Sequence, residues 1–184
     1  MTRRILLTSF STWKVHQKNN SSDQLLVEIS SIPSLASSLH FFRYLPVNLP
    51  VARSLTISKF QQVQPDVLVC CGMAEARSWL SVEAQATVHT RTLQTSLNLT
   101  QLTAGLKHTV LSQDAGRFVC NSLYYAMLDY LHRASPQCPC LFVHVPPVKS
   151  TGWELIVADF RQLIERLLGM ESLCQGTACG ILDP

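Results

Sequence analysis

The sequence predicts an α/β fold, a three-layer α/β/α sandwich with a central, mostly parallel (mixed) sheet. Apolar runs and amphipathic stretches alternate along the 184-residue chain without an internal repeat. The runs DVLVC at 66–70 and CLFVHV at 140–145 are apolar on both faces, as central strands of a covered sheet are. Because hydrophobic residues make up 47% and charged residues 15%, the chain has a globular composition, and its length suits one domain.

The expected elements alternate in the same way. The best marked helix is the last, because Thr151 and Glu154 stand at capping-box spacing before apolar residues at helical intervals. We expect a single domain over residues 1–169, and a tail over 170–184 that lacks a clear period and is poorly ordered. The predicted strands are Ile5–Phe10, Phe41–Val47, Val67–Gly72, Val82–Val88, Thr109–Gln113 and Leu141–Val145, and the predicted helices are Ser22–Ser31, Val51–Val63, Leu97–Leu106, Arg117–His132 and Gly152–Leu168.

Charge and hydropathy argue against several functional classes. The net charge is +3, and there is no run of Lys or Arg, so nucleic acid is not an expected partner. No apolar segment approaches the length that spans a bilayer, and the short run ILLTSF at 5–10 reads as a first strand rather than a signal peptide. The low content of charge leaves room for a subunit interface, and hence for a homo-oligomer.

The cysteines point to a reducing compartment. Seven cysteines, an odd number, occur without a secretory signal, which favours reduced thiols and a cytoplasmic location. Their spacings do not form a pair of C-x2-C knuckles, so we expect no metal. They are Cys70, Cys71, Cys120, Cys138, Cys140, Cys174 and Cys179.

One cysteine has the surroundings of a nucleophile. In DAGRFVCN at 114–121, Gly116 permits a tight turn out of a strand, Asp114 or a neighbour can cap the next helix, and Cys120 falls near the first turn. The partial positive charge there favours a thiolate, and free backbone N–H groups could bind an oxyanion. The alternative is a small core residue, since Cys120 shares a helical face with apolar residues.

A base and an orienting carboxylate can be placed beside it. His144 is a lone polar residue at the end of a strand that should be buried, and active sites of open α/β sheets form at the carboxyl ends of such strands. Glu83 is the carboxylate best placed within a strand to hold an imidazole tautomer. The alternative for His144 is a core histidine that is satisfied by hydrogen bonds. The alternative for Glu83 is a surface residue on an edge strand.

Together these segments resemble the pyroglutamyl-peptidase I family of cytosolic cysteine peptidases. SQDAGRFVCNSLYY and the later FVHVP are similar to the family's S-N-x-A-G-x-[FY]-[VL]-C-N-x-x-x-Y and F-I-H-V-P motifs, and Cys120 and His144 are 24 residues apart, as in the family. PDVLVCCGMAEARSWLSVE is similar to the segment that ends at the family's triad carboxylate, which falls on Glu83. The resemblance covers most of the chain, from Arg4 to about Pro147.

The resemblance implies a phosphorylase/hydrolase-like fold, often assembled as a homodimer or homotetramer, and no metal or cofactor. It implies that Cys120 is the nucleophile, His144 the base and then the acid, and Glu83 the group that orients His144. The reaction would remove an N-terminal pyroglutamyl residue from a peptide substrate. Residues implied to bind that substrate are Phe10, Trp13 and Phe118, which would form a slot for the lactam ring, with Asn19 and Met73 at further positions of the family pattern.

The chain departs from the family at three places. Lys14 and Val15 replace the glycines of a family F-G-G turn, and Met73, which cannot donate a hydrogen bond, stands where some members have a glutamine. A segment after Glu83 is shorter than in the family and lacks an arginine near the oxyanion, for which Arg91 could substitute, unless it is an ordinary surface residue. A thiol hydrolase of another small acyl amide, or a catalytically silent binding protein, therefore remain alternatives.

Overall fold

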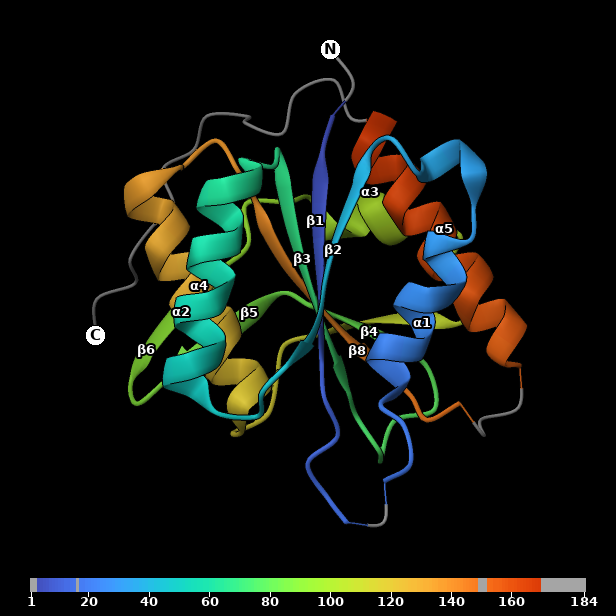
Figure 1. Cartoon of the computed structure of the whole chain (residues 1–184), viewed down its shortest axis with the longest axis horizontal. Coiled ribbons are helices and arrows are strands. Elements are labelled where there is room, and N and C mark those ends of the chain that lie inside the picture. The colour runs from blue at the N-terminus through green and yellow to red at the C-terminus, as the bar shows by residue number, and fades with distance from the viewer. Residues whose placement is uncertain (1–2, 16, 149–151, 170–184) are drawn as a thin grey trace.

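The structure is a computed structural model that describes residues 3–15, 17–148 and 152–169. Six strands form one twisted sheet in the order β2-β1-β3-β8-β4-β7 (Figure 1). Neighbouring strands are parallel except for β4 and β8, which are antiparallel. This confirms the predicted mostly parallel, mixed sheet. The strands are β1 (Ile5–Phe10), β2 (Leu39–Leu45), β3 (Val67–Met73), β4 (Leu80–Glu83), β7 (Thr109–Ser112) and β8 (Cys140–Val145).

Helices cover both faces of the sheet, as predicted. α1, α3 and α5 lie on one side and α2 and α4 on the other (Figure 1). The two buried clusters follow this division, because Leu25, Leu102 and Phe160 belong to one and Phe60 and Tyr124 to the other. The helices are α1 (Ser21–Ser30), α2 (Leu49–Val63), α3 (Leu99–Thr103), α4 (Val119–Ala134) and α5 (Trp153–Gly169), with a short 3-10 helix η1 (Pro33–Leu35).

Side-chain caps explain where several predicted bounds differ. Asn48 accepts a hydrogen bond from the Val51 amide, so α2 begins at Leu49 and β2 ends earlier than the predicted Val47. Asn98 caps α3 in the same way, so this helix begins at Leu99 rather than at the predicted Leu97, and it ends at Thr103 rather than at Leu106. Thr151 and the tail 170–184 lie outside the described residues.

The predicted strand Val82–Val88 is wrong. β4 ends at Glu83, and the chain leaves the main sheet at Ala84, whose amide donates to the Ser112 carbonyl and whose carbonyl accepts from the Thr95 amide. The next residues form β5 (Gln85–Val88), which pairs with the unpredicted β6 (Arg91–Gln94) as a separate antiparallel hairpin. The apolar alternation runs straight through Ala84, so it does not reveal the change of direction.

The hairpin is fastened to the start of α4 by one side chain. Asn121 accepts a hydrogen bond from the Thr87 amide at 3.0 Å and donates one to the Thr87 carbonyl at 2.7 Å. The side-chain amide of Asn121 thus makes the two hydrogen bonds with Thr87 that a backbone residue of a neighbouring strand would make. It holds the hairpin beside the first turn of α4, one residue away from Cys120.

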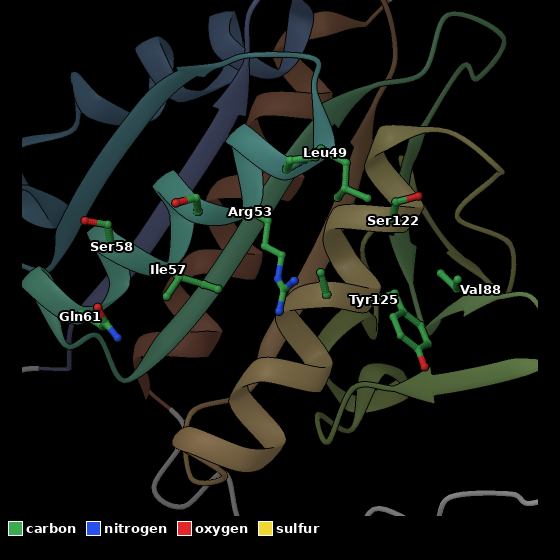
Figure 2. Close-up of a pocket in the computed structure, with 11 residues that line it drawn as sticks. Leu49, Arg53, Ile57, Ser58, Gln61, Val88, Ser122 and Tyr125 are labelled. Atoms are coloured by element: carbon green, nitrogen blue, oxygen red, sulfur yellow. The ribbon is translucent and has the colours of Figure 1, made fainter.

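A cavity of about 680 Å³ lies between α2 and α4 beside the hairpin (Figure 2). Arg53 and Tyr125 contribute to its wall, and the rest is apolar or neutral polar, with Leu49, Ile57, Ser58, Gln61, Val88 and Ser122 among its residues. Among the described residues that line it there is no thiol, imidazole or carboxylate. No helix within the described residues is both long and apolar enough to cross a membrane.

Candidate active site

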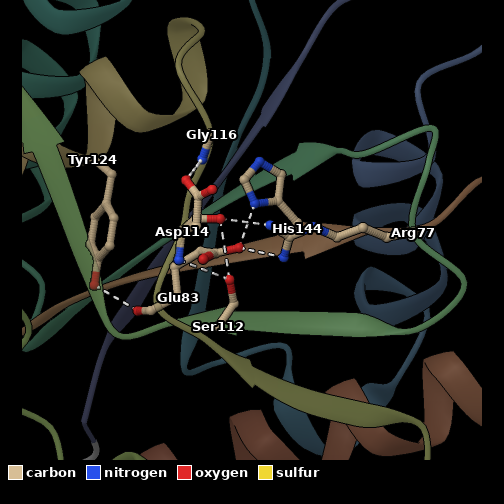
Figure 3. Close-up of polar contacts among 7 residues, drawn as sticks. All are labelled: Arg77, Glu83, Ser112, Asp114, Gly116, Tyr124 and His144. Carbon is tan, nitrogen blue, oxygen red and sulfur yellow. Dashed lines mark hydrogen bonds and ion pairs between the residues drawn. The ribbon is translucent and has the colours of Figure 1, made fainter.

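A buried carboxylate holds the imidazole of His144. Glu83 ends β4 and His144 lies near the end of β8, and the Glu83 Oε1 lies 2.7 Å from the His144 Nδ1 (Figure 3). Glu83 is 0% exposed and His144 5% exposed. A carboxylate at Nδ1 favours the tautomer with the proton on Nδ1. The Nε2 lone pair then remains free to accept a proton.

Arg77 completes this cluster, although the sequence analysis did not single it out. Its Nη1 donates to the Glu83 Oε1 at 2.6 Å and its Nη2 to the Asp114 carbonyl at 2.7 Å (Figure 3). Arg77 lies within PDVLVCCGMAEARSWLSVE, the stretch that resembles the family segment ending at Glu83, and that resemblance is the signal that could have identified it. Its positive charge offsets that of Glu83, which would otherwise be buried with only a histidine for partner.

The backbone of Glu83 is held as well. The Tyr124 hydroxyl, fully buried in α4, donates to the Glu83 carbonyl at 3.0 Å (Figure 3). The Glu83 Oε2 is buried and has no hydrogen-bond partner among the described residues. Oε1 therefore carries both side-chain contacts.

Cys120 lies in the first turn of α4, as the sequence predicts. Gly116 has a φ of +81° in the preceding turn, the left-handed region that favours glycine. Asp114 does not cap the helix, so that part of the prediction is wrong. Its Oδ1 accepts from the Gly116 amide at 2.8 Å, and the N-cap is Phe118, which makes no side-chain cap hydrogen bond. The side chain at the N-cap therefore leaves the helix's first N–H groups available.

The Cys120 thiol is protonated at neutral pH. Burial is the main cause that raises its pKa to about 12, and the neighbouring Cys70 and Glu83 act in the same direction. Its own backbone N–H and Arg77 act against this rise and are outweighed. Nucleophilic attack by this sulfur therefore requires a base that removes its proton.

A cavity of about 230 Å³ joins Cys120 and His144 with the predicted ring slot. Phe10, Trp13, Phe118 and Met73 all line it. The rings of Trp13 and Phe118 are tilted by 40° with centroids 6.3 Å apart, and Phe118 is 57% exposed. The volume is below the roughly 300–1,000 Å³ typical of sites for drug-sized ligands, and it therefore suits a small group.

Two residues predicted for the site do not line this cavity. Asn19 is exposed and lines a neighbouring cavity, whereas Asn20 lines the central one, caps α1 and donates to the Ser11 carbonyl at 3.1 Å. Arg91 is exposed at the start of β6, because the chain turns into the hairpin after Ala84. Arg77 and Arg117 both line the cavity, and Arg77 is the one that donates to Glu83 and to the Asp114 carbonyl.

Hydrogen bonds hold the loop around Lys14 and Val15, the two residues that stand where the resembled family has glycines. Gln17 Oε1 accepts hydrogen bonds from the Trp13 and Lys14 amides, and its Nε2 donates to the Glu75 Oε1 at 2.8 Å. Lys14 pairs with the same carboxylate group. Neither Lys14 nor Val15 has a positive φ, so this turn does not need glycine.

Known proteins are similar to this chain in sequence. Residues 86–154 match the family model described as pyroglutamyl peptidase, a stretch that contains Cys120 and His144. The chain is 23% identical to pyrrolidone-carboxylate peptidase of Bacillus subtilis over 79% of both chains. It is 28% identical to that of Halalkalibacterium halodurans over 58% of this chain and 66% of the relative.

The fold is similar to that of solved pyroglutamyl peptidases. The crystal structure of pyroglutamyl peptidase I from Bacillus amyloliquefaciens superposes with a TM-score of 0.81 at 18% identity, over 94% of this chain and 98% of that one. It confirms the predicted α/β fold. Together, the family model, the curated relatives and this structure show that the chain is similar to pyroglutamyl peptidases in sequence and in fold.

Proposed function

We propose that this chain is a cysteine omega-peptidase that removes N-terminal pyroglutamate from peptides. The observation that carries the proposal is the contact of His144 Nδ1 with the buried Glu83, on an imidazole that shares a small aromatic-walled cavity with Cys120. The names of the family model and of the curated relatives support the substrate class.

In the first half-reaction, His144 Nε2 takes the proton of Cys120 as the sulfur attacks the pyroglutamyl carbonyl carbon. The carbonyl oxygen becomes an oxyanion, which the uncapped N–H groups at the start of α4 stabilise. His144 then gives the proton to the leaving nitrogen. The C–N bond breaks, and a thioester between Cys120 and the pyroglutamyl group remains.

In the second half-reaction, water attacks the thioester carbon and gives a proton to His144. The C–S bond breaks, the sulfur regains that proton, and pyroglutamate leaves. Because the pKa of Cys120 is raised to about 12, the base has to act in every turnover rather than once to form a stored thiolate. Glu83 holds His144 in position through both steps and stabilises the imidazolium.

The lactam would lie against Trp13 and Phe118, with Phe10 at the buried end of the slot. Flat rings gain from such contacts. The Met73 sulfur accepts from the Ser21 amide at 3.5 Å and offers the lactam no donor. This motivates a second candidate, a thiol hydrolase of a different small acyl amide with the same three residues.

The test is hydrolysis of a fluorogenic pyroglutamyl amide by the reduced protein, by Cys120→Ala and by Cys120→Ser. A prolyl amide, which lacks the lactam carbonyl, is the control. The proposal expects turnover of the pyroglutamyl compound alone, and by the unsubstituted protein alone. Best turnover of another acyl amide would favour the second candidate, and a folded protein without any turnover would favour a silent binding protein.

A further inference from the structure

A second cavity adjoins the candidate active site across Arg77. It has a volume of about 540 Å³ and is lined by residues of β4, β7 and the turn before β4: Arg77, Ser78, Trp79, Ser81, Val110, Leu111 and Ser112. Arg77 also lines the cavity of Cys120 and His144, so the two cavities share this side chain.

Three residues on adjacent strands, His144, Ser81 and Val110, form a row across the sheet that leads from one cavity to the other. Ser81 of β4 lies opposite His144 of β8, and Val110 of β7 lies opposite Ser81. Residues opposite each other place their side chains on the same face of a sheet, and neighbouring strands are about 4.8 Å apart. The row from His144 to Val110 therefore spans about 10 Å, the length of about three extended residues.

This end of the sheet face is apolar and exposed. Trp79 is 45% exposed, Val110 is 46% exposed, and the indole of Trp79 stacks on the His108 imidazole with centroids 5.3 Å apart. β7 is the last strand of the sheet and pairs with β4 alone. Exposed apolar side chains in a contiguous group mark surfaces that bind a ligand or a partner.

The reaction chemistry says which part of a substrate reaches this surface. His144 must protonate the leaving nitrogen, so the peptide that follows the scissile bond starts beside His144. In the proposed function the acyl group occupies the slot of Trp13 and Phe118, in the same cavity. Another cavity, which shares Met73 with the active site, is lined mainly by polar residues, among them Gln17 and Lys18 of the loop before α1 and Gln24 in α1.

We propose that the groove of Trp79 and Val110 binds the second and third residues after the scissile bond, and that it favours peptides with apolar side chains there. This inference rests on the proposed function and names its substrate class. The apolar side chain gains by leaving water against the indole and the valine, which predicts a preference of about tenfold in kcat/KM.

The experiment compares two peptides of equal length, pyroglutamyl-Gly-Leu-Phe-amide and pyroglutamyl-Gly-Gly-Gly-amide. The readout is the ratio of their kcat/KM values for the unsubstituted protein, Trp79→Ser, Val110→Ser and the control Leu155→Ser. Leu155 is an exposed leucine on α5, on the opposite face of the sheet. We expect a ratio of about ten, a fall to below about three in Trp79→Ser and Val110→Ser, and no change in Leu155→Ser.

The outcomes separate the two proposals. Equal kcat/KM values for the two peptides would contradict the proposal for the groove. An unchanged ratio in both Trp79→Ser and Val110→Ser would contradict it as well. Neither result would contradict the pyroglutamyl-peptidase activity. Absence of cleavage of any pyroglutamyl peptide by the folded, reduced protein overturns the proposed function and the groove with it.

Discussion

Gly72 of β3 leaves the space that the Cys120 sulfur occupies. A Cβ atom at Gly72 would lie 2.7 Å from the Cys120 Sγ and 2.9 Å from the Phe142 Cζ, both closer than real contacts allow. Gly72 also lies opposite His144 in the register of β3 and β8. The absence of a side chain at this one position therefore lets the thiol approach the end of β8.

Gly72→Ala is expected to displace the Cys120 thiol and the ring of Phe142. We expect at least a tenfold loss of kcat with a pyroglutamyl amide, and a fall of about 1–3 kcal/mol in the free energy of unfolding. Urea unfolding and steady-state kinetics measure the two effects. Gly169→Ala, at a position with no atom within 4 Å of the added Cβ, is the matched control. Full activity in Gly72→Ala would contradict this role for Gly72.

Arg77→Met removes the cation that contacts Glu83 and the Asp114 carbonyl. We expect kcat/KM to fall between tenfold and a hundredfold and the free energy of unfolding to fall by about 3 kcal/mol, because a buried carboxylate loses its charged partner. The same substitution at Arg91, exposed on the hairpin, is the control and should change kcat/KM less than twofold. A larger loss in Arg91→Met than in Arg77→Met would return the oxyanion role to Arg91.

Glu83→Gln tests the tautomer of His144. A glutamine that turns its amide N–H₂ toward Nδ1 favours the proton on Nε2, which can then no longer accept the proton of Cys120. We expect kcat to fall by roughly a thousandfold, with circular dichroism unchanged. Glu28→Gln, an exposed carboxylate on α1, is the control. Retention of more than a tenth of the activity would show that Glu83 does not orient the base.

The pH dependence of the rate at which iodoacetamide alkylates Cys120 should show that the thiol has a high pKa. A thiol whose pKa lies at about 12 gains tenfold in thiolate per pH unit, so the rate constant should rise about a hundredfold from pH 7 to pH 9. Cys70, Cys71, Cys138 and Cys140 are buried and should react far more slowly. Peptide mass spectrometry in a Cys174→Ser/Cys179→Ser background follows each thiol. A rate that stays level over this range would instead indicate a thiolate already paired with the imidazolium.

The residues that were predictable from sequence are those whose signal is local. Strands β3 and β8 are apolar on both faces, and Gly116 and Cys120 stand at fixed distances from a helix start, so each can be placed without knowledge of the rest of the chain. Arg77 could not be paired with Glu83 in this way, because their contact depends on the path of the turn between them. Asn19 and Asn20 are adjacent in the sequence and of the same residue type. Only the structure shows that Asn20, the N-cap of α1, is the one that lines the cavity.

Because Asp23 and Arg43 form an ion pair, we expect the free energy of unfolding to depend on the protonation of Asp23. Arg43 donates to both carboxylate oxygens of Asp23 at 2.7 Å, and the buried Ser9 hydroxyl donates to the same carboxylate at 2.8 Å. Burial alone would raise the pKa of Asp23, but the bonds from Arg43 and Ser9 outweigh it, and the pKa lies below its ordinary value of 3.8. The pair fastens the first turn of α1, which carries Asn20 into the cavity.

A carboxyl group with a lowered pKa in the folded state binds protons less tightly there than in the unfolded chain. Its stabilisation is therefore complete at pH values above 3.8 and is lost as the pH falls through the lower, folded-state pKa. We expect Asp23→Asn to reduce the free energy of unfolding by about 1.5–3 kcal/mol at pH 6, and by much less at pH 2.5. Asp129→Asn, in an exposed helical pair with Arg133, should cost less than about 0.5 kcal/mol at either pH. Urea unfolding at both pH values measures these differences, and an equal loss for Asp23→Asn at both would mean that the charge of Asp23 contributes nothing to stability.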